Sequence, residues 1–188
     1  MPLTKEVTAP VFNLTDIFGR QINLEEYADK KVFIGFFRHA GCPFCNLRVH
    51  ALAKMRDELI ENGMEMIYFF ESGKDILLRS SFHREVNPIP IISDPDKKWY
   101  GAYGLEESGK GSAVGHLKYF VQSAINAKAK GLPVHPMKDG ESIKTMPAEF
   151  LLGPGLVVKD FHYSGELKDR LDFDAIREFS TASPSVKA

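Results

Sequence analysis

A single stretch, residues 33–45, limits most strongly what this chain can fold into, because it joins an apolar run to both cysteines of the chain. Residues 33–37 are continuously apolar, apart from one glycine, which is typical of a strand buried on both faces of a sheet. Cys42-Pro43-Phe44-Cys45 follows a short turn, and proline suits the first position of a helix, where an N–H would have no partner. The stretch predicts a strand followed by a helix, with Cys42 as the N-cap and its sulfur exposed above the helix end.

Two thiols at this spacing on a helix N-terminus are typical of redox chemistry. The free N–H groups and the helix dipole favour a thiolate, and Cys-x-x-Cys thiols can have pKa values well below about 8.5. We expect Cys42 to attack and Cys45, one turn further and more buried, to resolve the mixed disulfide. Arg38 is either a cation that lowers the thiol pKa or a solvated charge at the strand end. His39 is either a cation or proton donor for the leaving thiolate, or a surface histidine.

Three other roles for the cysteine pair compete with this interpretation. The two side chains could be buried structural residues. A structural zinc ion needs four ligands, and the chain has no second Cys-x-x-Cys, although His39 and His50 flank the motif. A structural disulfide is disfavoured in a chain that looks intracellular. Dithiol chemistry explains the position of the pair best, so we predict a redox-active centre with no metal and no other cofactor.

Size and charge narrow the class of protein. A chain of 188 residues, 44% of them hydrophobic, can form one core; we expect a single domain over residues 1–180 and a disordered tail over 181–188. The net charge of −1 creates no field that would attract nucleic acid or a membrane. The first residues lack the apolar region of a signal peptide, and no stretch is long and apolar enough to span a membrane. We therefore expect a cytoplasmic protein.

Strand and helix patterns alternate along the chain, which predicts an α/β fold with helices on both faces of a sheet. Ser72 and Asp75 resemble a capping box that opens a helix ending near residue 85. Arg48 reads as a solvated residue of the helix that follows Cys42. Residues 131–145 show no periodicity, and loops of this length are lids, binding segments or mobile loops. The expected elements are a short hairpin formed by 11–14, 16–19 and 21–22, strands at 32–37, 65–70, 89–92, 148–152 and 156–161, and helices at 24–29, 43–61, 72–85, 96–103, 112–130 and 172–179.

Over residues 10–179 the chain resembles the thioredoxin-like superfamily, and within it the AhpC/TSA (peroxiredoxin-like) branch. The resemblance implies a thioredoxin-like fold with an N-terminal β-hairpin, a central mixed sheet flanked by helices, and a helical insertion at about 105–145 before a cis-proline strand. It also implies that Met146–Pro147 is the cis bond and presents backbone groups to the substrate. Four motifs carry the resemblance. They are residues 10–16 followed by Gly19, residues 36–38 directly before the cysteine turn at 41–45, residues 92–95 followed by 100–105, and residues 146–155.

The sequence departs from peroxiredoxins in one respect that bears on activity. Peroxiredoxins share the pattern Pro-x-x-x-Thr/Ser-x-x-Cys, but neither cysteine of this chain is preceded by the proline or the hydroxyl residue at these spacings. In addition, Glu149 stands in the strand after Pro147, where an arginine is expected. Cys-Pro-Phe-Cys is instead similar to glutaredoxins and other disulfide exchangers. The resemblance implies a thiol–disulfide oxidoreductase acting on a disulfide or hydroperoxide, regenerated by thioredoxin or glutathione. The alternatives are an antioxidant peroxidase, and a non-enzymatic redox sensor that switches residues 131–145. By analogy, the 112–130 helix is a candidate homodimer contact.

Overall fold

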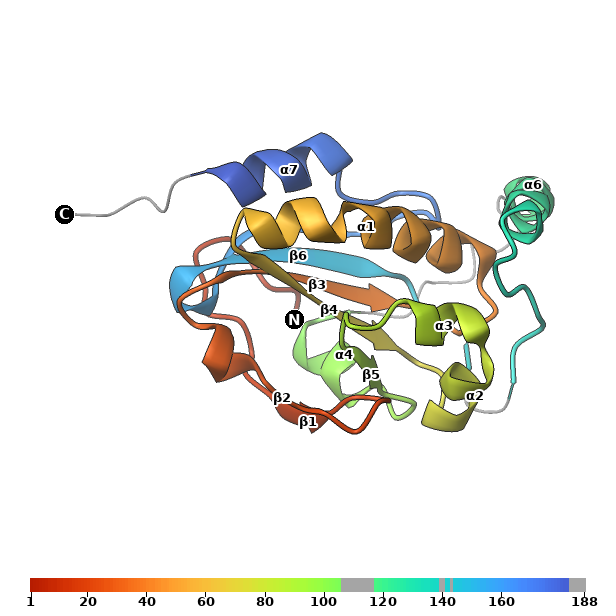
Figure 1. Cartoon of the computed structure of the whole chain (residues 1–188), viewed down its shortest axis with the longest axis horizontal. Helices are drawn as coiled ribbons and strands as arrows, with labels where there is room; N and C mark the ends of the chain where they lie inside the picture. Colours follow the sequence, from red (N-terminus) through yellow and green to blue (C-terminus); the bar gives the residue numbers. More distant parts are fainter. Residues whose placement is uncertain (106–116, 139–140, 143, 183–188) are drawn as a thin grey trace.

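A five-stranded mixed sheet forms the centre of the protein, with the strand order β5-β4-β3-β6-β7 (Figure 1). The computed structural model describes residues 1–105, 117–138, 141–142 and 144–182. β4 runs parallel to β3 and to β5, whereas β6 is antiparallel to both β3 and β7. The strands are β3 (Lys31–Phe37), β4 (Met64–Phe70), β5 (Ile91–Ser93), β6 (Ala148–Gly153) and β7 (Val157–Tyr163).

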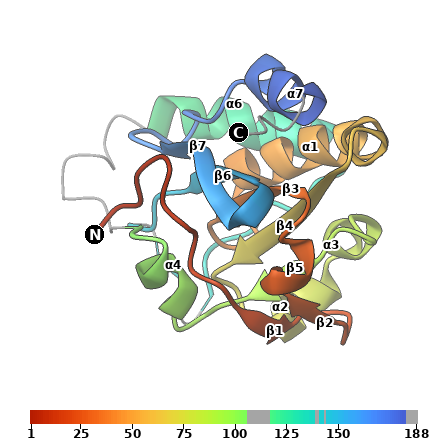
Figure 2. The same cartoon turned by 90° about the vertical axis from the view of Figure 1, so that its left-hand side faces the viewer.

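Successive residues of a strand point to opposite faces of the sheet, and different elements pack on each face. On one face, Phe33 and Phe37 pack with residues of α1 (Pro43–Glu61), α3 (Ser81–Glu85) and α7 (Phe173–Thr181). On the other, Ile34 and Phe36 pack under the N-terminal segment, the hairpin of β1 (Asn13–Thr15) and β2 (Gln21–Asn23), and α4 (Lys98–Ala102). Figures 1 and 2 show these two layers on either side of the strands.

The remaining described elements lie at the edges of these layers. Short helices join the strands: η1 (Leu24–Tyr27) precedes β3, α2 (Lys74–Arg79) follows β4, and η2 (Pro154–Leu156) connects β6 to β7. α6 (Leu117–Ala129) packs across the N-terminal end of α1 (Figure 1). No helix in the described part of the chain combines the length and hydropathy needed to cross a membrane.

The fold class predicted from the sequence is confirmed, including the N-terminal hairpin and the mixed sheet flanked by helices. α1 begins and ends as expected, with Cys42 as N-cap, Pro43 in the first turn and Asn62 as C-cap. Of the expected 112–130 helix, residues 117–129 are helical and 112–116 lie outside the described residues. The expected tail begins too early, because Thr181 still belongs to α7, and its residues from 183 onward lie outside the described residues.

Two local predictions were wrong. The expected 72–85 helix is two helices, because Ser80 leaves helical geometry and its hydroxyl caps α3 by accepting from His83 N at 3.4 Å. Ser72 caps nothing; its Oγ accepts the N–H of Ala40 at 2.7 Å. The Met146–Pro147 bond is trans, since the only cis bond within the described ranges is Asn87–Pro88. Trans is the favoured isomer of X–Pro bonds by about 0.5–1 kcal/mol.

Candidate active site

The two cysteines lie at the junction between β3 and α1, and both are free thiols. Cys42 has extended backbone angles (φ −73°, ψ 112°), and its carbonyl accepts the N–H of Asn46 at 3.0 Å, the first bond of the helix. Cys45 lies one turn inside α1, and its Sγ accepts the N–H of Arg38 at 3.4 Å. The local sequence therefore places both sulfurs at the positive end of the helix dipole.

The two thiols have opposite pKa shifts. Burial alone would raise the pKa of Cys42, but hydrogen bonds from Cys45 and the positive charge of Arg38 outweigh it and lower that pKa to about 6. Burial, together with the hydrogen bond to Cys42 and the charge of that residue, raises the pKa of Cys45 well above its ordinary range. At neutral pH the pair therefore holds one thiolate, on Cys42, and one thiol, on Cys45.

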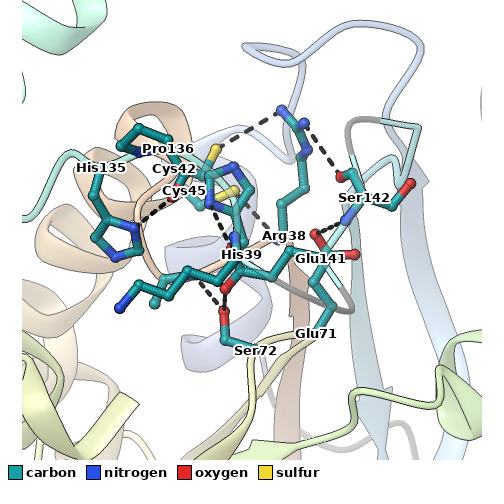
Figure 3. A network of polar contacts seen from close by, with 12 residues as sticks. Arg38, His39, Cys42, Cys45, Glu71, Ser72, His135, Pro136, Glu141 and Ser142 are labelled. Atoms are coloured by element: carbon teal, nitrogen blue, oxygen red, sulfur yellow. Dashed lines mark hydrogen bonds and ion pairs between the residues drawn. The ribbon is translucent and has the colours of Figure 1, made fainter. Parts of the chain in front are cut away.

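Cys42 is buried, although its sulfur was expected to be exposed above the helix end. Only 1% of the residue is accessible to solvent, and Cys45 is fully buried. The segment that follows α6 crosses over the turn before Cys42 (Figure 3), and Arg38, whose Nη1 lies 4.0 Å from Cys42 Sγ, contacts this segment at the carbonyl of Ser142. Asn46 Nδ2 links this segment to the turn, because it donates to the carbonyl of Ala40 at 2.7 Å and to that of Pro133 at 2.8 Å. The burial of Cys42 is thus a tertiary effect rather than a property of the motif.

Arg38 lies between the cysteines and the covering segment. Its side chain is buried, with Nη1 4.0 Å from Cys42 Sγ and Nη2 3.4 Å from the carbonyl of Ser142 (Figure 3). A guanidinium at this position stabilises the thiolate form of Cys42. The alternative that Arg38 is a solvated charge is wrong, because only 4% of the residue is exposed.

His39 supplies no positive charge to the site. Burial, with the nearby charges of Arg38 and His135, lowers its pKa to about 3, so the ring is neutral at pH 7. Its Nδ1 lies 3.7 Å from Oε2 of Glu141, which is too long for a hydrogen bond. A cationic His39 is therefore disfavoured by burial, and its role as a proton donor stays a prediction. The alternative of a surface histidine is wrong, because the residue is 6% exposed.

Two buried carboxylates complete the polar network above the cysteines. Glu71 follows β4 directly and accepts from the N–H of Ser142 at 3.2 Å and from Oγ1 of Thr145 at 2.6 Å. Burial raises its pKa despite these bonds and the nearby Lys97. Glu141 accepts a short hydrogen bond from Oγ of Ser72 (Figure 3). Both carboxylates therefore link the covering segment to the end of β4.

A second buried ionic group lies on the side of Cys45. Arg48, one turn after Cys45, donates from Nε and Nη2 to the two carboxylate oxygens of Glu149, at 2.8 and 2.7 Å. Nη2 also donates to the carbonyl of Leu171 at 2.7 Å, and the guanidinium lies over the ring of Phe173. The expectation that Arg48 is solvated was wrong: β6 brings a carboxylate to this face of α1, so the charge is compensated without water.

Met146 and Pro147 precede β6 and lie at the edge of the dithiol region. Met146 packs against the apolar cluster that contains both cysteines. The carbonyl of Pro147 accepts the N–H of Ser164 at 2.9 Å, so it is already engaged within the protein. Within the described residues, no group of three or more His, Cys, Asp or Glu side chains is arranged to hold a metal ion.

Four polar residues of the site were missed from the sequence: Glu71, Ser72, Glu141 and Ser142. A signal existed for Glu71, because Arg38 and Glu71 each come directly after paired residues of two parallel strands, Phe37 and Phe70. The carboxyl ends of parallel strands meet at one edge, so their next residues are neighbours. No comparable signal existed for Glu141, which meets Ser72 across 69 positions of sequence.

The fold and a dithiol at the strand–helix junction define a thioredoxin-like protein. A family model described as AhpC/TSA family matches residues 6–159. The chain therefore belongs to the AhpC/TSA family, as the sequence motifs predicted.

Known relatives include a peroxiredoxin and a thiol-disulfide oxidoreductase. Peroxiredoxin Bcp of Escherichia coli K12 is 27% identical over 104 residues, which cover 55% of this chain and 66% of that protein. Thiol-disulfide oxidoreductase ResA of Bacillus anthracis is 28% identical over 105 residues, which cover 56% of this chain and 59% of that protein. The chain thus spans 66% of the length of the first relative and 59% of the second, less than two thirds of each.

Solved structures agree with the fold. Peroxidoxin BcpB from Mycobacterium tuberculosis is 14% identical, with a TM-score of 0.65 over 94% of this chain and 95% of that one. A peroxiredoxin 6 of Arenicola marina is 13% identical, with a TM-score of 0.66 over 95% of this chain and 72% of that one. At these identities the similarity extends to the thioredoxin-like architecture alone.

Proposed function

We propose that this protein is a thiol–disulfide oxidoreductase in which Cys42 is the nucleophile and Cys45 the resolving cysteine. The observation that carries the proposal is the free dithiol at the start of α1 with the Arg38 guanidinium 4.0 Å from Cys42 Sγ. This arrangement lowers the pKa of Cys42, and only a thiolate attacks a disulfide. The family and the two relatives named peroxiredoxin and thiol-disulfide oxidoreductase support the same class of chemistry.

The proposed reaction has two exchanges. The Cys42 thiolate attacks one sulfur of the substrate disulfide, a Cys42–substrate bond forms, and the other substrate sulfur leaves as a thiolate that takes up a proton. Cys45 then loses its proton and attacks Sγ of Cys42, so that the intramolecular disulfide forms and the second substrate thiolate leaves. The substrate gains two electrons and two protons. A thiol reductant, thioredoxin or glutathione, returns the Cys42–Cys45 disulfide to the dithiol.

Arg38 has a supporting role in this proposal. Its guanidinium, 4.0 Å from Cys42 Sγ, stabilises the attacking thiolate, and it stabilises the same thiolate when the reductant releases it from the Cys42–Cys45 disulfide. Pro43 fixes the start of α1 and so the position of Cys42 relative to the helix N–H groups. Met146, which is partly buried against the apolar cluster, and its neighbour Pro147 are the proposed contact for the substrate backbone.

A second candidate, reduction of hydroperoxides, is favoured by the burial of Cys42, because a peroxide is among the smallest oxidants that could reach it. The thiolate would attack a peroxide oxygen, the O–O bond would break, and the alcohol or water would leave with a proton. The resulting sulfenic acid on Cys42 would condense with the Cys45 thiol to the same disulfide and release water.

Trapping the intermediates tests both candidates. Reduced protein is mixed in stopped flow with glutathione disulfide or with hydrogen peroxide, and thiols are counted against time. We expect Cys45→Ser to accumulate a glutathione adduct on Cys42 and Cys42→Ser to be inert. Rapid loss of two thiols to peroxide, with slow reaction with glutathione disulfide, would establish the peroxidase instead. Unchanged turnover in Cys42→Ser would exclude the assigned roles of the two cysteines.

A further inference from the structure

The segment that covers Cys42 consists of residues 132–138 together with Glu141 and Ser142, and we call it the cover segment. It follows α6 and passes over the turn between β3 and α1 (Figure 3). Gly41 shows how closely the two approach, because a Cβ at this position would lie 2.6 Å from Nδ1 of His135 and would also collide with the His135 carbonyl. The turn tolerates the cover segment only because residue 41 has no side chain.

Polar contacts hold the far end of the cover segment. The Glu141 carboxylate accepts from Oγ of Ser72 and from the N–H of Lys138 at 2.7 Å. Its neighbour Ser142 donates its N–H to Glu71 and accepts from Arg38. Ser72 is in turn fixed by the N–H of Ala40, within the dithiol turn itself. The cover segment is therefore fastened directly to the residues that flank Cys42.

Apolar burial adds little to this attachment. Leu132 is buried in the core and Val134 packs partly buried against it, whereas residues 136–138 are exposed. Segments with few buried apolar contacts open at low free-energy cost while the rest of the protein stays folded. Opening of the exposed part therefore depends on the contacts of Glu141 and Ser142 at one end and on the fit of His135 against Gly41 at the other.

From this geometry we infer that the cover segment selects substrates by size: it admits small oxidants to Cys42 and excludes protein disulfides unless the segment opens. Attack on a disulfide needs three sulfurs nearly in line, so a protein substrate must bring its own backbone to the sulfur, whereas a low-mass disulfide or hydroperoxide needs only a small opening. This inference rests on the proposed function, because size selection matters only if Cys42 is the attacking thiolate. It adds the substrate class, namely low-mass disulfides or hydroperoxides.

Alkylation with reagents of two sizes tests the inference without any turnover. Reduced protein is treated with iodoacetamide or with a maleimide carried on a long polyethylene glycol chain, and modification of Cys42 is followed by peptide mass analysis. Each rate is divided by the rate for the urea-unfolded chain. We expect the wild-type protein to discriminate strongly against the large reagent.

Two variants open the cover segment from opposite ends. Glu141→Ala removes the acceptor for Ser72, and Gly41→Ala introduces a Cβ that collides with His135. A lost hydrogen bond to a charged group changes the opening equilibrium roughly tenfold or more. We expect both variants to raise the large-to-small rate ratio about tenfold, and Glu141→Gln, which keeps an acceptor, to raise it less. Glu166→Ala, which replaces an exposed glutamate of the β7–α7 loop, is the matched control and should leave the ratio unchanged.

Each outcome bears on the inference. Equal relative rates of the two reagents in the wild-type protein would overturn it, and so would unchanged ratios in both opening variants. If Glu141→Ala does not fold, Glu141→Gln and Gly41→Ala still decide, because one weakens the contact with Ser72 and the other disturbs the fit against His135. Failure of the proposed function appears separately, as turnover that survives in Cys42→Ser, since alkylation depends only on access to the thiol.

Discussion

Two buried ionic groups flank the cysteines, and they are built differently. On the side of Cys45, Arg48 and Glu149 come from α1 and β6 and meet in a bidentate pair at 2.7–2.8 Å. On the side of Cys42, Arg38 contacts the sulfur at 4.0 Å and the cover segment at 3.4 Å. Regular elements hold the first group in one arrangement, whereas irregular backbone holds the second through longer contacts.

The difference indicates separate tasks for the two groups. A bidentate pair between a helix and a strand fixes how the two elements pack, and it has no reason to change when a sulfur gains or loses charge. Longer contacts to a sulfur and to a carbonyl can be exchanged as Cys42 alternates between thiolate and disulfide. We therefore expect changes near Cys45 to affect mainly stability, and changes near Cys42 to affect mainly reactivity.

The largest effect should come from breaking the Arg48–Glu149 pair. Glu149→Leu leaves the Arg48 guanidinium buried without its carboxylate, which costs about 3–5 kcal/mol of unfolding free energy. The double variant Arg48→Met/Glu149→Leu should recover most of this loss, because the uncompensated charge is gone. Urea unfolding of the reduced proteins measures both.

An exposed ion pair provides the control for this prediction. Glu58 on α1 contacts Arg177 on α7 at 3.2 Å, with both side chains over 40% exposed. Glu58→Leu should change the unfolding free energy by about 1 kcal/mol or less. A double variant at Arg48 and Glu149 that is no more stable than Glu149→Leu would show that the pair does not act as a unit.

The two regions also differ in how far the sequence predicts them. The strand, the cysteine turn and the helix from Pro43 to Asn62 follow from local signals: an apolar run, a proline in the first turn and an Asn-Gly stop. Glu149 stands out in the sequence only as a departure from the family pattern, and its partner Arg48 is 101 residues away. The burial of Cys42 depends on a cover segment without periodicity. Such contacts are set by the tertiary path of the chain, which local patterns do not encode.

An intermediate effect is expected at Arg38. The thiolate of Cys42 is stabilised by this cation, so Arg38→Met favours the neutral thiol and should raise the pKa of Cys42 from about 6 by about one unit or more. The pH profile of iodoacetamide alkylation measures it: reactivity is lost as the pH falls through this pKa, and the profile of the variant should lie at higher pH.

Charge-conserving and distant substitutions separate the electrostatic effect from a structural one. Arg38→Lys keeps the positive charge and should keep most of the pKa shift. Arg56→Gln, on a part of α1 remote from the cysteines, should leave the profile unchanged. A Cys42 pKa that stays near 6 in Arg38→Met would contradict the electrostatic role of Arg38 and leave the hydrogen bonds from Cys45 as the cause of the shift.

The smallest effect is expected at Arg170, which belongs to the Cys45 side but also lowers the pKa of Cys42. Its Nε lies 3.8 Å from Glu149, and Nη1 donates to Ser164 and to the carbonyl of Asp169. Because Arg170 contributes least among the groups that lower this pKa, Arg170→Gln should raise the pKa of Cys42 by about half a unit or less. The same alkylation profile measures this shift.

The double variant Arg38→Met/Arg170→Gln tests whether the two ionic groups act on Cys42 independently. Sites without shared partners have additive effects, whereas members of one network couple. If Arg38 and Arg170 act on Cys42 from separate groups, their two pKa shifts should add. A double-variant shift well above or below the sum would mean that the sulfurs join both groups into one network, and that the pair near Cys45 responds to the redox state after all.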